Sequence, residues 1–329
     1  MRALVCEAIG GEEHLVVRDD WQPRECGSGD VRIAVAAASV NFPDTLVIRG
    51  LYQVKQNPPF VPGMEVSGVV NEVGAQVTAF VPGDRVLVLT GVGAFAEEIV
   101  VPVPPTQVHR IPDGMPFDEA AAFDLTYGTA GHAWDRAGLQ AGETVLVLGA
   151  AGGCGSAAIE IARARGACVI AVAGGAVKTK LCQELGADHV IDHTTVAQLS
   201  SAVRELTDGR GVDVLFDPVG GADVRENIRC LGWNGRYLVV GFTAGAIPQL
   251  GLNQTILKSI SIIGVAYGAS AVVDPAANTA LFARLFDWYE AGLVRPRIGH
   301  RFPLERGADA VRVVHDRQAL GKVVIEIGA

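Results

Sequence analysis

The chain has 329 residues, 49% of them hydrophobic, and its formal net charge is −9. This apolar content excludes a disordered chain, and the length predicts about two domains with a sizeable core. The negative charge argues against nucleic acid or an anionic membrane surface as the main partner.

The sequence gives no signal for export or membrane insertion. No apolar run reaches the ~18 residues that a spanning helix needs. Acidic residues interrupt the stretch after Met1 early, which is not the pattern of a signal peptide. We therefore expect a cytoplasmic protein.

The cysteines are scattered and none forms a C-x-x-C pair, so we expect small buried hydrophobes, without disulfides or a zinc site. The six positions are Cys6, Cys26, Cys154, Cys168, Cys182 and Cys230. Cys154 is the one candidate for a reactive thiol, because it lies at a predicted helix N-terminus.

Residues 1–120 have the pattern of short strands. Apolar or alternating segments at 31–35, 66–73 and 84–89 lie near glycine or proline turns. This spacing predicts a barrel-like β domain. A helical segment is predicted to begin at Phe117 and leads toward the next domain.

A glycine-rich turn follows a strand at 144–148 and precedes a helix. The spacing is Gly149-x-x-Gly152-x-x-Gly155, with Gly153 and Cys154 inside it. A helix N-terminus offers free N–H groups and partial positive charge to a pyrophosphate, and glycine lets the backbone approach it. Strand, glycine turn and helix together favour a dinucleotide site.

From here strands and helices alternate. Strands are predicted at 144–148, 168–173, 189–192, 212–216, 235–240 and 260–265, and helices at 153–165, 176–186, 196–207, 221–231 and 275–291. This order predicts a doubly wound parallel sheet that binds its ligand at the carboxyl ends of the strands. A last strand at 322–327 is expected to return to the first domain.

Several ordered motifs carry a family resemblance. They are Gly63-Met-Glu-Val-Ser-Gly68, Phe80-x-x-Gly83-Asp-Arg-Val86, Gly93-Ala-Phe-Ala-Glu97, the glycine turn and Val239-Val-Gly-Phe242. Together they resemble the medium-chain dehydrogenase/reductase superfamily, and most closely its zinc-independent, ζ-crystallin-like quinone oxidoreductases. The resemblance implies a GroES-like β-barrel catalytic domain (1–123 and 296–329) and an NADPH-binding Rossmann domain (124–295).

Departures from the zinc-containing members select this branch. Met64 stands where those members carry histidine, and the stretch 39–44 lacks the expected cysteine. The structural-zinc lobe is also missing. Because catalytic zinc needs three protein ligands, we predict no metal and no Lewis acid for alcohol oxidation.

The cofactor is predicted to be NADPH. An NAD site usually places an acid about 20 residues past the glycines, but residues 171–178 contain none. Lys178, after the short turn at Gly174, suits a 2′-phosphate. The resemblance implies that Lys178, His193 and Arg317 surround this phosphate. Taken singly, each also fits a solvated charge or a loop residue.

Other cofactor contacts are expected near the nicotinamide and at the strand ends. The candidates are Asn41, Thr126, Thr129, Gly241, Phe242 and Val265. Asn41 and Tyr52 match positions that line the cleft in the family. Asn41 can bind the nicotinamide ribose or the acceptor oxygen, or simply hold a turn. Tyr52 can stack on a planar acceptor or donate to its oxygen, or pack at a loop base.

Three functions remain open from the sequence. The favoured one is NADPH-dependent hydride transfer to a quinone or activated carbonyl acceptor without zinc. The second is reduction of an enone or enoyl thioester, and the third is an NADPH-binding structural or RNA-binding protein. We also predict a homodimer, because the apolar strand 261–265 is last in its domain and can pair across a two-fold axis.

Overall fold

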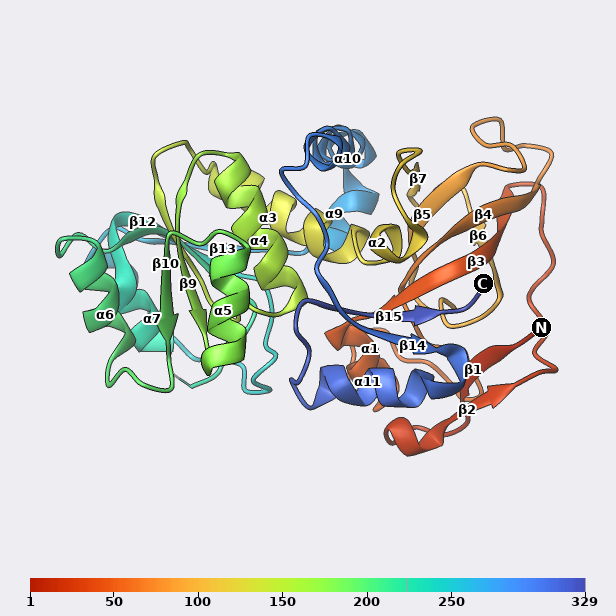
Figure 1. Cartoon of the computed structure of the whole chain (residues 1–329), viewed down its shortest axis with the longest axis horizontal. Coiled ribbons are helices and arrows are strands. Elements are labelled where there is room, and N and C mark those ends of the chain that lie inside the picture. Colours follow the sequence, from red (N-terminus) through yellow and green to blue (C-terminus); the bar gives the residue numbers. More distant parts are fainter. Residues whose placement is uncertain (223, 329) are drawn as a thin grey trace. The chain divides into compact units, whose positions relative to one another are not determined.

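The computed structural model describes residues 1–222 and 224–328. The chain forms two compact units, coloured along the sequence in Figure 1. The first unit contains Met1–Leu125, Ser270–Phe282 and Pro296–Ala329, and the second contains Thr126–Ala269 and Ala283–Arg295. Residues 270–282, within the predicted Rossmann boundaries, therefore group with the first unit.

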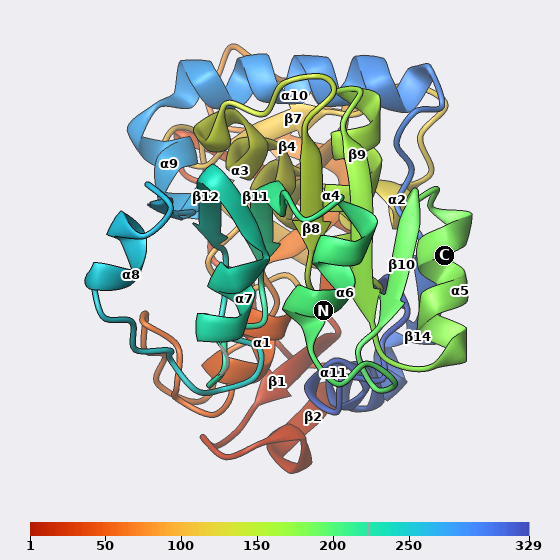
Figure 2. The same ribbon diagram turned by 90° about the vertical axis from the view of Figure 1, so that its left-hand side faces the viewer.

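The second unit contains a six-stranded parallel sheet in the order β10-β9-β8-β11-β12-β13. Its strands are β8 (Thr144–Val147), β9 (Cys168–Ala173), β10 (His189–Asp192), β11 (Val212–Asp217), β12 (Leu231–Val239) and β13 (Ser261–Gly264). Figure 2 shows the strands from β12 to β10 side by side. The order reverses at β8, so the predicted doubly wound sheet is confirmed.

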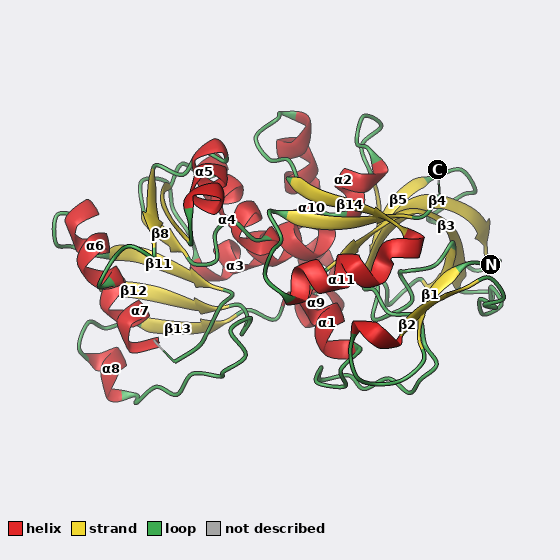
Figure 3. Cartoon of the chain, turned by 60° about the horizontal axis from the view of Figure 1, so that its bottom comes forward, coloured by secondary structure: helices red, strands yellow, loops and turns green. Residues whose placement is uncertain are grey.

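Helices cover both faces of this sheet. They are α3 (Thr129–Ala137), α4 (Gly153–Ala164), α5 (Ala176–Glu184), α6 (Leu199–Leu206) and α7 (Val224–Cys230). The short α8 (Asn253–Ile256) has no buried residue. In Figure 3, α4 and α5 lie on one side of the strands and α6 and α7 on the other. The buried core between the layers includes Leu146, Ile170 and Leu215, which come from neighbouring strands. Apolar strand runs between amphipathic helices thus give the layered unit that the sequence predicts.

The first unit is built on a seven-stranded sheet in the order β14-β15-β3-β4-β5-β7, with β6 also paired to β3. Its strands are β3 (Asp30–Val40), β4 (Glu65–Val73), β5 (Arg85–Leu89), β6 (Glu98–Pro102), β7 (Val108–Arg110), β14 (Ile298–Pro303) and β15 (Lys322–Glu326). A separate pair joins β1 (Ala3–Cys6) to β2 (Leu15–Arg18). Since β15 pairs antiparallel with β3, the predicted return of the last strand is confirmed.

Short helices accompany the sheet of the first unit. They are α1 (Phe42–Val47), α2 (Phe117–Ala121) and α11 (Gly307–His315). The remaining helices are α9 (Tyr267–Val273) and α10 (Pro275–Glu290), which both run across a unit boundary. Within the described residues, none of the helices is long and apolar enough to cross a membrane.

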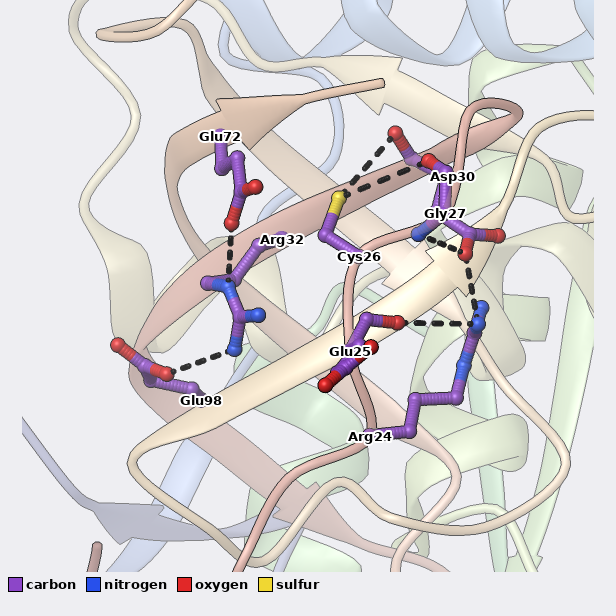
Figure 4. Close-up of polar contacts among 8 residues, drawn as sticks. All are labelled: Arg24, Glu25, Cys26, Gly27, Asp30, Arg32, Glu72 and Glu98. Atoms are coloured by element: carbon purple, nitrogen blue, oxygen red, sulfur yellow. Dashed lines mark hydrogen bonds and ion pairs between the residues drawn. The ribbon is translucent and has the colours of Figure 1, made fainter.

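Ion pairs fix β3 from its start (Figure 4). Arg24 donates to Asp30, the first residue of the strand, over 2.6 Å. Two residues later, Arg32 donates to Glu72 of β4 over 2.9 Å and to Glu98 of β6 over 3.2 Å. Charged side chains on β4 and β6 therefore hold β3, whose far end leads to Asn41.

All six cysteines are free thiols, and their burial differs from the expectation. Cys6, Cys182 and Cys230 are buried, as expected for small hydrophobes, but Cys26 and Cys154 are only partly buried. Cys168 is also partly buried, because it opens β9 at the edge of the core.

Candidate functional site

The glycine turn of the second unit has the geometry that its spacing predicts. Gly149 follows β8 with φ of +56°, a backbone conformation that favours glycine. Gly152 is the extended N-cap of α4, which begins at Gly153. A Cβ on Gly155 would collide with the Gly149 carbonyl oxygen and lie 2.6 Å from the Ala150 Cα. Only glycine at 155 therefore permits this close packing of turn and helix.

This turn fits a dinucleotide pyrophosphate. The first N–H groups of a helix have no partner within the helix, and α4 is a full 12 residues long. Its first turn consists of Gly153, Cys154 and Gly155, so small side chains flank the open end of the helix. Backbone donors, the helix dipole and the absence of bulky side chains together suit an anionic diphosphate.

Asp217 organises the neighbouring strand end, and no motif pointed to it. Its side chain is buried at the end of β11, where Oδ1 accepts hydrogen bonds from the N–H groups of Val219 (2.8 Å) and Gly220 (2.9 Å). The Tyr237 hydroxyl donates to Oδ2. Val219 in turn lies against the glycine turn, since its Cγ2 is 3.0 Å from a Cβ built on Gly149.

The predicted contacts Gly241 and Phe242 belong to the same region. Gly241 donates its N–H to the Asp217 carbonyl over 3.2 Å. The Phe242 ring lies so close to Gly220 that a Cβ there would be 2.7 Å from its Cδ1. The loop after β11 thus connects both residues to the glycine turn. Val265 follows β13 and donates to the Val239 carbonyl over 3.0 Å.

A second cluster surrounds the turn after β9. Gly174 follows the strand, and a Cβ on it would be 2.7 Å from Nε2 of His193. Lys178 lies in the first turn of α5, whose N-cap is Gly175. The structure therefore places Gly174, Lys178 and His193 around the turn after β9. Their contact with a ligand remains a prediction.

In the first unit, Asn41 belongs to a buried network of hydrogen bonds. Its Oδ1 accepts from Lys322 Nζ over 2.6 Å, and its Nδ2 donates to Glu65 Oε2 over 3.0 Å. Glu65 Oε2 also accepts from Lys322 (3.1 Å) and from the Ser39 hydroxyl (2.5 Å). Glu65 Oε1 accepts from the Leu125 N–H over 2.8 Å. Four segments distant in sequence therefore meet at one carboxylate.

This network limits what Asn41 can do. Its Nδ2 hydrogens go to Glu65 and to Ser39, whose carbonyl and hydroxyl oxygens lie at 3.3 and 3.2 Å. One lone pair of Oδ1 is taken by Lys322, which leaves one free to accept. In this arrangement Asn41 can accept from a ribose hydroxyl, whereas its N–H groups are not available to an acceptor oxygen.

Asp44 and Tyr52 lie beside this network. Asp44 Oδ2 accepts the Asn41 N–H over 2.7 Å, and its Oδ1 is buried without a partner among the described residues. Burial raises the pKa of Asp44 to about 7. Burial, with a smaller effect from the Asp44 charge, raises the pKa of Tyr52. The phenol therefore stays protonated at neutral pH and can donate.

The donor chemistry here does not suit zinc. The residues at this place are Ser39, Asn41, Met64 and Glu65, and the carboxylate of Glu65 is paired with an ammonium. Catalytic zinc takes three ligands from histidine, cysteine and carboxylate. Among the described residues, no three such side chains cluster in a way that could hold a metal ion.

Comparison with known proteins supplies the family. An alcohol dehydrogenase GroES-like domain model matches residues 27–113, and a zinc-binding dehydrogenase model matches 153–282. A quinone oxidoreductase-like protein 2 homolog of Nematostella vectensis is 39% identical over 98% of this chain and 88% of its own. The Mus musculus quinone oxidoreductase is 33% identical over 99% of this chain and 97% of its own.

The chain belongs to the quinone oxidoreductase family of the medium-chain dehydrogenases/reductases. A solved mycobacterial protein, complexed with NADPH, has a TM-score of 0.91 and 30% identity over 99% of this chain and 100% of its own. Family membership and this neighbour indicate a nicotinamide cofactor. The predicted combination of a GroES-like domain and a Rossmann-type domain is confirmed.

The remaining predicted residues of this quinone oxidoreductase family member lie in both units. Thr126 is buried in a π-helical turn at Asp124–Gly128, and Thr129 opens α3. Arg317 follows α11 in the first unit, with φ of +58°. Their roles, like those of Asn41 and Tyr52, remain predictions. Asp217, Glu65 and Lys322 were missed, although a lysine beginning an apolar strand was a visible anomaly.

Proposed function

We propose that this protein reduces a quinone or an activated carbonyl acceptor with NADPH and without zinc. The observation that carries the proposal is the Glu65–Lys322 pair, in which both side chains are nearly fully buried. The carboxylate of Glu65 is therefore neutralised by an ammonium, and the family resemblance puts Met64 and the stretch 39–44, which lacks cysteine, where zinc enzymes carry metal ligands. The acceptor must then be electrophilic by itself, as a quinone or enone is.

The cofactor is assigned to the glycine turn of the second unit. The N-terminus of α4 binds the pyrophosphate, and Lys178 and His193 lie where a 2′-phosphate is expected. A bound nicotinamide supplies the hydride, while the protein supplies orientation and excludes water. Support comes from the turn geometry, from the phosphate-side cluster and from the NADPH-bound neighbour.

Tyr52 is the proposed proton or hydrogen-bond donor to the reduced acceptor. Its hydroxyl makes no hydrogen bond within the described part of the chain, and its raised pKa keeps the proton in place. A donor aimed at developing negative charge stabilises an enolate or hydroquinone anion. Asn41, with its N–H groups already engaged, is proposed to accept from the nicotinamide ribose.

The function is tested by NADPH oxidation with 1,4-benzoquinone, 9,10-phenanthrenequinone, an alkenal and an enoyl-CoA, with NADH and EDTA as controls. We expect turnover with the quinones, preference for NADPH and no effect of EDTA. Turnover restricted to the alkenal or thioester would replace the quinone with that acceptor class. NADPH binding without any turnover would favour the structural or RNA-binding alternative.

The role of Tyr52 is tested with Tyr52→Phe, which removes the hydroxyl and keeps the ring. We expect kcat with quinones to fall about 10- to 100-fold, because one donor to a developing anion is lost. The Kd for NADPH should not change. Tyr289→Phe, a change on helix α10, is the matched control. An unchanged kcat in Tyr52→Phe would remove Tyr52 from the proposed mechanism.

A further inference from the structure

Asp192 places a carboxylate beside the turn after β9. Strand β9 itself ends without an acidic residue. Strands β9 and β10 pair in parallel, with Asp192 in register with Ala173, the last residue of β9. Both strands end at the same edge of the sheet. An acid from the neighbouring strand therefore stands next to Gly174 and Gly175.

One oxygen of Asp192 holds this turn. Its Oδ1 accepts from the Gly175 N–H (3.1 Å), the Thr194 N–H (2.9 Å) and the Thr194 hydroxyl (2.7 Å). These hydrogen bonds, the hydroxyl first, lower the pKa of Asp192. The group therefore carries a full negative charge at neutral pH. Its Oδ2 makes no hydrogen bond within residues 1–222 and 224–328.

The same turn carries the residues proposed for a 2′-phosphate. His193, the next residue, lies against Gly174, and Lys178 is three residues past Gly175 in the first turn of α5. A phosphate here would meet the Lys178 ammonium and the Asp192 carboxylate together. A ribose 2′-hydroxyl, in contrast, would find the free Oδ2 as a hydrogen-bond acceptor.

We propose that Asp192 determines cofactor specificity: Oδ1 positions the Gly174–Gly175 turn for either dinucleotide, while the carboxylate charge opposes a 2′-phosphate and favours a 2′-hydroxyl. The protein then binds NADH as well as NADPH, with a smaller preference for NADPH than its cationic residues alone would give. This inference rests on the proposed cofactor site and concerns only which nicotinamide dinucleotide it accepts.

Two substitutions separate charge from positioning. Asp192→Asn keeps an oxygen that can accept from Gly175 and Thr194 but removes the charge. Asp192→Ala removes both. The matched control is Asp188→Asn, because Asp188 precedes the opposite end of β10 and accepts the Val169 N–H over 2.7 Å. Thermal unfolding of every variant checks the fold, and Asp192→Ser gives a second neutral acceptor.

The readout is equilibrium binding of NADPH, NADH, 2′,5′-ADP and 5′-AMP, followed by intrinsic fluorescence or calorimetry. For Asp192→Asn we expect the ratio of the NADH Kd to the NADPH Kd to rise about three- to tenfold, as for one charge near a phosphate in a wet site. The rise should shrink at high salt, because a charge effect is screened. Asp192→Ala should weaken both dinucleotides, and Asp188→Asn neither.

The outcomes distinguish this inference from the proposed function. A ratio in Asp192→Asn and Asp192→Ser within twofold of the original, while the unmodified protein binds both dinucleotides, would overturn the inference alone. An unmodified protein that binds neither dinucleotide would overturn the proposed cofactor site itself. A salt-independent change would indicate a merely structural role for Asp192 and also contradict the inference.

Discussion

Lys322 and Glu65 form an ion pair with side-chain exposures of 3% and 0%. Taking two charges out of water is costly, and the attraction between them offsets that cost only while both are present. Lys322→Met leaves the Glu65 carboxylate buried beside Asn41 and Ser39 without its cation. We expect the free energy of unfolding to fall by about 3–5 kcal/mol, measured by urea denaturation.

Two further variants test this reading of the pair. Lys180→Met removes a lysine whose side chain is 76% exposed and whose partner Glu184 is 3.9 Å away, so it should cost less than about 1 kcal/mol. The double variant Glu65→Gln/Lys322→Met should be more stable than Lys322→Met alone, because the uncompensated charge is gone. Equal losses for Lys322→Met and Lys180→Met would contradict the assignment.

The glycine turn contains two positions that differ in their tolerance of a methyl group. A Cβ on Gly155 meets the backbone of Gly149 and Ala150, whereas a Cβ on Gly152 would lie 3.4 Å from the Gly149 oxygen. Gly155→Ala should therefore destabilise the protein by ~1–3 kcal/mol through overpacking. Gly152→Ala changes an N-cap and should cost about 0.5 kcal/mol. Thermal unfolding without nucleotide compares them, and similar losses would count against the close packing.

Some residues of the candidate site could be predicted from the sequence, and others could not. Gly149 and Gly155 were predictable, because a local turn dictates them and their partners lie within a few residues. The network at Glu65 was not, because Lys322 is 257 positions away and meets it only through the register of β15 on β3. Asp192 escaped notice for the same reason, since its partner Gly175 lies on the loop after another strand.

The positions of most strands along the chain were easier to predict than the contacts between distant residues. The strand predicted at 168–173 matches β9, since a buried parallel strand is a continuous apolar run, and the strand predicted at 189–192 matches β10. The strand predicted at 235–240 instead begins at Leu231, since a register shift against β11 adds residues and gives Asn234 a φ of +59°. β14 was missed because its exposed alternate residues are Gly299, Arg301 and Pro303, and glycine and proline are unusual in strands.

Helix α4 carries a buried acid that makes stability depend on pH. Glu160 Oε2 accepts from the Tyr127 hydroxyl (2.5 Å) and from the Arg295 N–H (3.0 Å). Burial, opposed by these hydrogen bonds, raises the pKa of Glu160 to about 7 from a usual 4.5. Between these values the native state binds more protons than the unfolded chain, so stability falls as pH rises and the loss is complete above about 7.

Glu160→Gln tests this dependence, because glutamine keeps an oxygen that can accept from Tyr127 and Arg295. In the unmodified protein, Glu160 should lower the free energy of unfolding by on the order of 3 kcal/mol between pH 4.5 and 7. This decrease should be absent from the variant. Urea denaturation across this range gives the slope. Glu184→Gln on α5, where the side chain is 48% exposed, is the control. An unaltered slope in Glu160→Gln would show that the carboxyl ionises normally.

At the scale of the whole molecule, the second unit leaves an apolar surface around its edge strand. Strand β13 lies at the end of the sheet, and within the described residues it pairs only with β12. Ile262 on β13 is 43% exposed, and Leu252, Ile256 and Leu257 just before it are exposed by 69% or more. Unpaired edges and apolar patches of this kind are normally covered by a partner. A second copy can pair its own β13 across a two-fold axis, so we propose a homodimer.

Ile262→Lys tests this dimer, because a two-fold symmetric interface would contain the substitution twice. Each copy loses about 1.5 kcal/mol of apolar burial, so the dimer Kd should rise about 100-fold or more. Sedimentation velocity at micromolar concentration should give about twice the 34.4 kDa of one chain for the unmodified protein. The control is Val177→Lys on α5, where the valine side chain is 67% exposed. This substitution should leave the dimer intact. An unmodified protein that sediments as a monomer would reject the interface, and a variant dimer as tight as the original would place the interface elsewhere.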